Sequence, residues 1–183
     1  DREILMTSSW DNARSRLPWL FASWVGGVCA AAIIGIFDNT LQSTLALAAF
    51  IPVVIGMGGN IGTQTSTLVV RGLATGRVNV GNNINIIFKE IRVGLILGIL
   101  YGLLLGLFAI MSFVNISPYL GLVVGLGIAC SMLIATAFGS LVPLLLHRMD
   151  IDPAIATGPF VTTSIDILGV TLYFVIAKIF LPV

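Results

Sequence analysis

Long apolar runs separated by short polar segments dominate the sequence. Because about 20 apolar residues cross the hydrocarbon core of a bilayer as a helix, these runs predict five membrane-spanning helices. The predicted helices cover residues 17–37, 44–70, 93–114, 119–146 and 154–181. Residues 71–85 form a polar connector, and residues 86–92 predict a short interfacial helix that leads into the third span. The pattern therefore predicts an all-α membrane protein with five transmembrane helices.

The composition supports this class. Hydrophobic residues make up 57% of the chain, charged residues only 9%, and the mean hydropathy is +1.07. A soluble domain carries about a quarter charged residues, because its surface must be solvated. We therefore expect the lipid bilayer as the surroundings of the chain and, with a net charge of only +1, no nucleic-acid partner. Cys29 and Cys130 lie inside apolar runs, where we expect small buried hydrophobes.

The basic residues predict how the chain crosses the membrane. With five spans, Lys178 is the only one of the nine Lys and Arg residues that falls on the second side. Because Lys and Arg concentrate in cytoplasmic loops, we expect a multi-pass protein of the cell (inner) membrane with a cytoplasmic N-terminus and an external C-terminus. Pro18 suits the start of the first span. Residues 1–16 are polar, and we expect them to follow an N-terminal neighbour that has been removed from the membrane domain, residues 17–183.

One carboxylate lies in the middle of a predicted span. Of the eight acidic residues, only Asp166 lies there, and a central Asp costs about 2.5–3.5 kcal/mol on insertion scales, so it must face protein or water. Thr162 and Thr163 precede it on one helix face, Gly169 follows, and Pro159 tends to kink the helix upstream. The Asp166 carboxylate, the threonine hydroxyls and the carbonyls exposed at a kink supply oxygen ligands, and together they predict a cation site at Asp166. The alternative is a protonated Asp that is hydrogen-bonded inside the bundle.

The second predicted span carries a matching polar stripe. Asn60, Gln64 and Thr67 fall on one helix face, beside a glycine-rich run. The glycines permit either close helix approach or a locally unwound segment whose carbonyls face water; a plain glycine-rich crossing is the alternative to a role in a pathway. The candidate lining residues of an ion pathway are Gly58, Gly59, Asn60, Gln64, Thr67, Thr162, Thr163 and Gly169.

The residue types favour a hard cation, because oxygen ligands without thiolate or imidazole suit such ions. One carboxylate is little for a divalent ion, whereas a symmetric dimer places two at its axis. Mg²⁺ dehydrates reluctantly, so such a site can hold the hydrated ion through its water shell. Mn²⁺, Ca²⁺ and protons fit the same residue types.

Three stretches resemble the transmembrane domain of the MgtE family of magnesium channels. They are RLPWL at residues 16–20, PVVIGMGGNIGTQTSTLVVRGLATG at residues 52–76, and DPAIATGPFVTTSIDILG at residues 152–169. The resemblance implies a homodimer of five-helix subunits, with the pore at the dimer axis and lined mainly by spans two and five. It also implies that Asp166 of both subunits binds hydrated Mg²⁺, which is the transported ion.

The resemblance further implies cytoplasmic N and CBS domains that sense Mg²⁺, are absent from this chain, and are joined to the first span by a helix whose end lies within residues 1–16. Glu90, Asp150 and Asp152 fall on the cytoplasmic side, where we expect them either solvated in loops or facing those domains.

Two other functions remain open from the residues alone. In a secondary transporter, Asp166 would relay protons or bind a substrate cation, and paired broken helices in two repeats would be expected. A membrane scaffold without transport leaves Asp166 and the Asn60/Gln64 stripe unexplained. We expect no enzyme, since the sequence shows no nucleophile–base pair and no set of metal ligands typical of catalysis.

Overall fold

The computed structural model describes residues 8–77, 83–113 and 117–181. These residues form helices α2 (Ser9–Ile36), α3 (Asp38–Ser43), α4 (Ala46–Ala74), α5 (Asn83–Ser112), α6 (Leu120–Arg148) and α7 (Pro153–Phe180). No strand occurs within those ranges. All the helices except α3 are long and apolar enough to cross a membrane, which makes five candidate spans. The prediction of an all-α protein with five membrane-spanning helices is confirmed.

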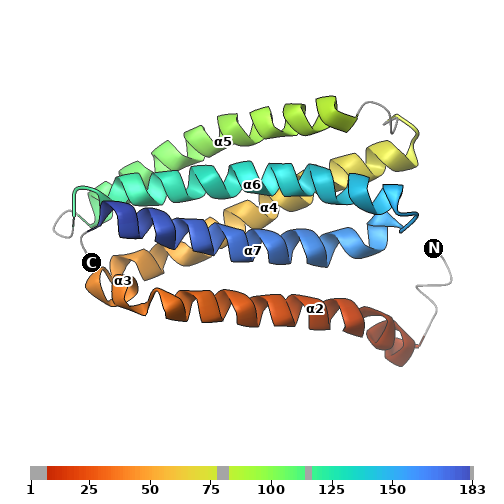
Figure 1. Cartoon of the computed structure of the whole chain (residues 1–183), viewed down its shortest axis with the longest axis horizontal. Helices are drawn as coiled ribbons and strands as arrows, with labels where there is room; N and C mark the ends of the chain where they lie inside the picture. Colours follow the sequence, from red (N-terminus) through yellow and green to blue (C-terminus); the bar gives the residue numbers. More distant parts are fainter. Residues whose placement is uncertain (1–7, 78–82, 114–116, 182–183) are drawn as a thin grey trace.

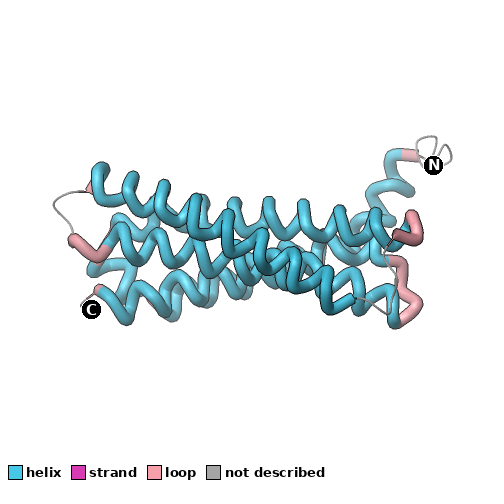
Figure 2. Tube along the Cα trace, turned by 90° about the horizontal axis from the view of Figure 1, so that it is seen from above, coloured by secondary structure: helices cyan, strands magenta, loops and turns pink. Residues whose placement is uncertain are grey.

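The long helices lie lengthwise along one direction, with the loops gathered at the two ends of the bundle (Figures 1 and 2). Helix α6 is central, because it packs against α4, α5 and α7, whereas α2 packs mainly against α7. The start of α2 and the end of α7 lie at opposite ends (Figure 1). This arrangement agrees with an odd number of membrane crossings.

Small residues bring α5 and α6 into close contact. Gly102 and Gly106 of α5 face Gly125 and Gly121 of α6, and a Cβ atom added at Gly102 would lie 2.6 Å from the carbonyl oxygen of Gly125. Such close backbone approach is typical of helix pairs in membranes, where no hydrophobic driving force acts between helices and van der Waals packing takes its place. On its other sides α6 contributes fully buried side chains, among them Leu120, Val123, Val124, Ile128 and Ala135.

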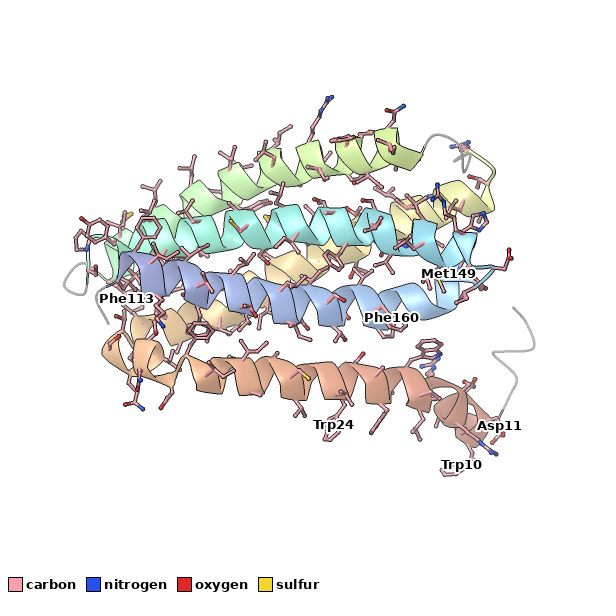
Figure 3. The ribbon with its side chains drawn as sticks, in the orientation of Figure 1. Trp10, Asp11, Trp24, Phe113, Met149 and Phe160 are labelled. Carbon is pink, nitrogen blue, oxygen red and sulfur yellow. The ribbon has the colours of Figure 1, made fainter. Side chains whose placement is uncertain are left out.

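Helix α2 lies at the edge of the bundle. Its contact with α7 includes Trp19 against Phe160, with ring centroids 6.2 Å apart, and Phe37 stacked on Phe174 at 5.3 Å. Phe160 points from α7 toward α2, whereas Trp24 points away from the bundle (Figure 3). The outward face of α2 is apolar, as expected for a helix that contacts lipid.

The same edge position explains one wrong prediction. Cys29 is exposed on α2, although its apolar surroundings in the sequence suggested burial, while Cys130 on α6 is partly buried. Because α2 packs mainly against one neighbour, most of its apolar residues face outward. An apolar run in a membrane protein therefore does not show which residues are covered by other helices and which face lipid.

Two helix starts differ from the sequence-based prediction. Helix α2 begins at Ser9, with the Ser8 hydroxyl accepting a hydrogen bond from the Trp10 N–H, so Pro18 lies inside the helix rather than at its start. Residues 86–92 are not a separate interfacial helix but part of α5, which runs without a break from Asn83. The buried face of α5 continues through this segment, since Glu90 and Gly94 are both buried.

Candidate ion pathway

Helix α4 has one face buried against the rest of the subunit. Gly58 and Gly62 on this face meet α7, where a Cβ atom at Gly62 would overlap Ile165 and one at Gly58 would lie 2.9 Å from the same side chain. The helix is continuous from Ala46 to Ala74. The glycines therefore serve close helix approach, and the alternative of a locally unwound segment is wrong.

Hydrogen bonds from three neighbouring helices hold the buried face of α4. They join Tyr173 Oη to the Leu47 carbonyl at 3.1 Å, Ser131 Oγ to the Val54 carbonyl at 3.2 Å, and Thr65 Oγ1 to a Glu90 carboxylate oxygen at 3.2 Å. Tyr173 belongs to α7, Ser131 to α6 and Glu90 to α5. Since the bonds are spread along the helix, they fix the rotation of α4 about its own axis, and with it the direction of its opposite face.

That opposite face of α4 is polar and points out of the subunit. Asn60, Thr63, Gln64 and Thr67 are all exposed and, with Leu68, line a hollow of about 510 Å³. Thr63 and Thr67 donate to carbonyls of their own helix, at 2.8 Å each. In the part of the chain that the structure describes, the amides of Asn60 and Gln64 make no hydrogen bond. Lipid cannot satisfy such amides, so this face requires water or protein.

The stripe predicted from the sequence did not include Thr63. It lies three residues after Asn60 and four before Thr67, so the same helical spacing that identified the stripe also includes it. Its hydroxyl bonds the carbonyl of Gly59, a residue that is only partly exposed.

Asp166 lies on α7 at the depth of this stripe. Its neighbour Ile165 contacts both Gly58 and Gly62, and Asn60 lies between those two glycines in α4. The Asp166 side chain is partly exposed, and within the described ranges its carboxylate makes neither a hydrogen bond nor an ion pair. The described residues thus give no support to the alternative of an internally hydrogen-bonded aspartate.

The remaining candidates on α7 have partners inside the subunit. Thr162 is partly buried and donates to the Gly158 carbonyl at 3.0 Å. Thr163 lies at the contact with α2, where a Cβ atom added at Gly26 would overlap its methyl group. Gly169 is buried against α6. The described residues of one subunit hold no cluster of three or more acidic, His or Cys side chains that could bind a metal.

Comparison with known proteins identifies the chain at this point. A family model described as "MgtE: Divalent cation transporter" matches residues 51–176, a range that contains both the α4 stripe and Asp166. The chain belongs to the MgtE family. The resemblance found in the sequence is thereby confirmed.

Proteins named magnesium transporter MgtE are similar over most of this chain. Those of Bacillus subtilis, Enterococcus faecalis and Thermus thermophilus are 37%, 36% and 34% identical over 96%, 92% and 91% of it. The chain spans 38%, 37% and 36% of the length of these MgtE proteins. The similarity therefore concerns one part of each relative.

One of the acidic residues expected on the cytoplasmic side of this MgtE-family chain, Glu90, differs from the prediction of a solvated loop residue. Glu90 is only 9% exposed and accepts the hydrogen bond from Thr65, so it does not lie in a solvated loop. Its flanking residues Lys89 and Arg92 are exposed. Asp150 and Asp152 are exposed between α6 and α7, as expected.

Proposed function

We propose that this chain forms the pore of a magnesium channel and conducts hydrated Mg²⁺ between two copies of itself. The observation that carries the proposal is the α4 stripe, which points out of the subunit with the amides of Asn60 and Gln64 unbonded among the described residues. Membership of a family of divalent cation transporters supplies the class of cargo. Relatives named as magnesium transporters favour Mg²⁺ among the divalent ions.

A homodimer accounts for two unusual features of the subunit, namely the polar face of α4 that points outward and the single carboxylate of Asp166. A second copy related by a two-fold axis covers the polar face of α4 with the same polar face and leaves a wet path between the two. It also brings a second Asp166 carboxylate, and two negative charges balance one divalent ion. Detergent-solubilised protein should accordingly have the mass of two protomers, and a monomer that conducts Mg²⁺ normally would contradict this part of the proposal.

The lining residues suit an ion that keeps its water. Amides and hydroxyls at Asn60, Gln64, Thr67 and Thr162 can bond to waters of the Mg²⁺ shell, and the carboxylate of Asp166 supplies charge. Stripping the shell is costly for Mg²⁺, because the ion is small and dehydrates reluctantly. Gly58 and Gly169 act in the proposal by letting the helices approach. Gly59, beside which the subunit leaves open space, and Thr163 stay candidate lining residues. The distribution of Lys and Arg favours a cytoplasmic position for the start of α2.

The decisive experiment measures Mg²⁺ flux in proteoliposomes for Asp166→Asn. The change keeps the shape of the side chain and removes its charge, so flux should be lost while the dimer persists. Asp150→Asn is the matched control, because Asp150 is exposed in the α6–α7 loop and its positive φ of 56° is one that Asn also adopts. Mg²⁺ flux in Asp166→Asn equal to that of Asp150→Asn would refute the proposal.

The secondary transporter remains the alternative, with Asp166 as a proton relay or substrate-cation carboxylate. That mechanism commonly uses discontinuous helices at the binding site, whereas α4 and α7 are continuous. Flux measured across an imposed pH gradient separates the two. A channel should conduct Mg²⁺ in proportion to its own electrochemical gradient, and uptake driven by the proton gradient would favour the transporter.

A further inference from the structure

Ser131 of α6 lies between the two helices that carry the polar residues. It is only 1% exposed, and its hydroxyl donates to the Val54 carbonyl of α4 at 3.2 Å. A Cβ atom added at Gly58 of α4 would overlap Ser131 Oγ, and one added at Gly169 of α7 would lie 3.0 Å from it. One glycine on each helix therefore makes room for a single hydroxyl.

This contact lies at the depth of Asp166. Gly169 follows Asp166 by three residues, which is about 4.5 Å along the axis of a helix. Gly58 also contacts Ile165, the residue before Asp166, and precedes Asn60 by two positions. Ser131 approaches α4 from its buried side, so the hydroxyl sits behind the pathway rather than in it.

The hydroxyl also fixes α4 against sliding or turning. In an α-helix the Val54 carbonyl already accepts the N–H four residues later, so the Ser131 hydroxyl adds a second bond that comes from another helix. A displacement of α4 relative to α6 by a fraction of an ångström would lengthen this bond or press Gly58 onto the hydroxyl. The spacing of α4, α6 and α7 is thus set by one small polar side chain at this depth.

We propose that Ser131 sets the separation of α4 and α7 at the level of Asp166, and thereby the ability of the pathway to distinguish hydrated ions by size. This inference rests on the proposed function, since it presumes that α4 and α7 line the path of the ion. Ser131 is a positioning residue: it touches neither the ion nor its water. A path that selects a hydrated ion by diameter is sensitive to small changes in width, whereas a change in helix stability alone lowers the flux of every ion alike.

The test compares the ratio of Mg²⁺ flux to Ca²⁺ flux in proteoliposomes for Ser131→Ala and Ser140→Ala. Ser140 is a matched control because it is fully buried on the same helix, yet its hydroxyl donates only to α6's own Thr136 and Ala137 carbonyls. Ser131→Ala should lower the ratio by about fivefold, within the range expected for the loss of one hydrogen bond. Ser140→Ala should leave the ratio at the wild-type value.

A second variant covers the case in which Ser131→Ala does not fold. Within 4 Å, a Cβ atom at Gly169 meets only Ser131 atoms, Oγ at 3.0 Å and Cβ at 3.7 Å. Gly169→Ala should therefore change the flux ratio by displacing the hydroxyl. Combined with Ser131→Ala it should add no further change, because only the ordinary 3.7 Å contact remains.

The outcomes separate this inference from the proposed function. If wild-type Mg²⁺ flux is abolished by Asp166→Asn but the ratio is unchanged in both Ser131→Ala and Gly169→Ala, Ser131 does not set selectivity and only this inference fails. If the effects of Ser131→Ala and Gly169→Ala simply add, the shared hydroxyl is not their cause, and the inference fails as well. If flux does not depend on Asp166, the proposed function itself fails.

Discussion

The hydroxyl of Thr65 on α4 donates a hydrogen bond to the carboxylate of Glu90 on α5, over 3.2 Å. Both residues are buried, with Thr65 2% and Glu90 9% exposed. A buried carboxylate is stable only when hydrogen-bond donors or opposite charges compensate for its lost hydration. This pair therefore ties to α5 the same part of α4 that carries the polar stripe on its opposite face.

Thr65→Val should destabilise the subunit, because it leaves the Glu90 carboxylate buried without this donor while keeping the side-chain volume. The expected cost is about 1–3 kcal/mol, the penalty for an unsatisfied buried polar group. Thermal denaturation in detergent measures it. Thr75→Val is the control, since Thr75 is exposed and bonds only carbonyls of its own helix, those of Arg71 and Gly72. Equal melting temperatures for the two variants would show that the bond contributes nothing.

Gly62→Ala and Gly56→Ala should differ in sign, although both add one methyl group to α4. At Gly62 the new atom would overlap Ile165 and lie 3.3 Å from Val161, and overpacking of this kind costs about 1–3 kcal/mol. At Gly56 nothing lies within 4 Å, so the helix gains about 0.8–1 kcal/mol from the better propensity of Ala. The melting temperature should fall for Gly62→Ala and stay or rise for Gly56→Ala. A fall in both would mean that Gly56 is covered in the assembled protein.

Gln64→Leu should reduce Mg²⁺ flux without destabilising the subunit. The side chain is exposed and makes no hydrogen bond among the described residues, so its loss removes no contact within the subunit. In the proposed pathway, however, the side-chain amide of Gln64 forms hydrogen bonds with water molecules in the hydration shell of the ion. Gln42→Leu is the matched control, since Gln42 is an exposed glutamine outside the stripe, bonded to Asp38 at 2.6 Å. Normal flux in Gln64→Leu would remove α4 from the lining of the pathway.

The sequence was sufficient for the number of spans and for the polar stripe, because both depend on local patterns. Apolar length gives a membrane helix, and the spacing of Asn60, Gln64 and Thr67 gives one helix face. A mid-span carboxylate is evident from position alone. These features do not depend on which helix packs beside which.

Features that depend on neighbouring helices were not predictable in this way. Glu90 stands between the exposed residues Lys89 and Arg92, so its surroundings in the sequence resemble a solvated segment. Only the three-dimensional structure shows that its carboxylate is buried and accepts a hydrogen bond from Thr65 of α4. Thr163 likewise lies three residues from Asp166, but the position of α2 decides that it meets Gly26. Helical spacing gives relative directions on one helix, and not the helix that each direction meets.

The proposed mechanism also predicts how the ion is held. A carboxylate bonded directly to Mg²⁺ has its oxygen at about 2.0–2.1 Å, whereas one that bonds to a water of the shell lies roughly 4 Å or more from the metal. We expect the larger distance at Asp166, because a pathway of amides, hydroxyls and one carboxylate per subunit cannot replace six waters. The hexaammine complex of cobalt(III) carries a similar shell that does not exchange, so it should compete for the site and block Mg²⁺ flux.

Two measurements check this prediction independently. Cobalt hexaammine should block Mg²⁺ flux in wild-type protein and in Asp150→Asn alike, and a higher Mg²⁺ concentration should relieve the block. A high-resolution structure with Mg²⁺ bound gives the distance itself. An Asp166 oxygen at inner-shell distance would mean that the site selects a dehydrated ion. Selectivity would then arise from direct coordination, and helix spacing set by Ser131 would matter through ligand geometry rather than through the diameter of a hydrated ion.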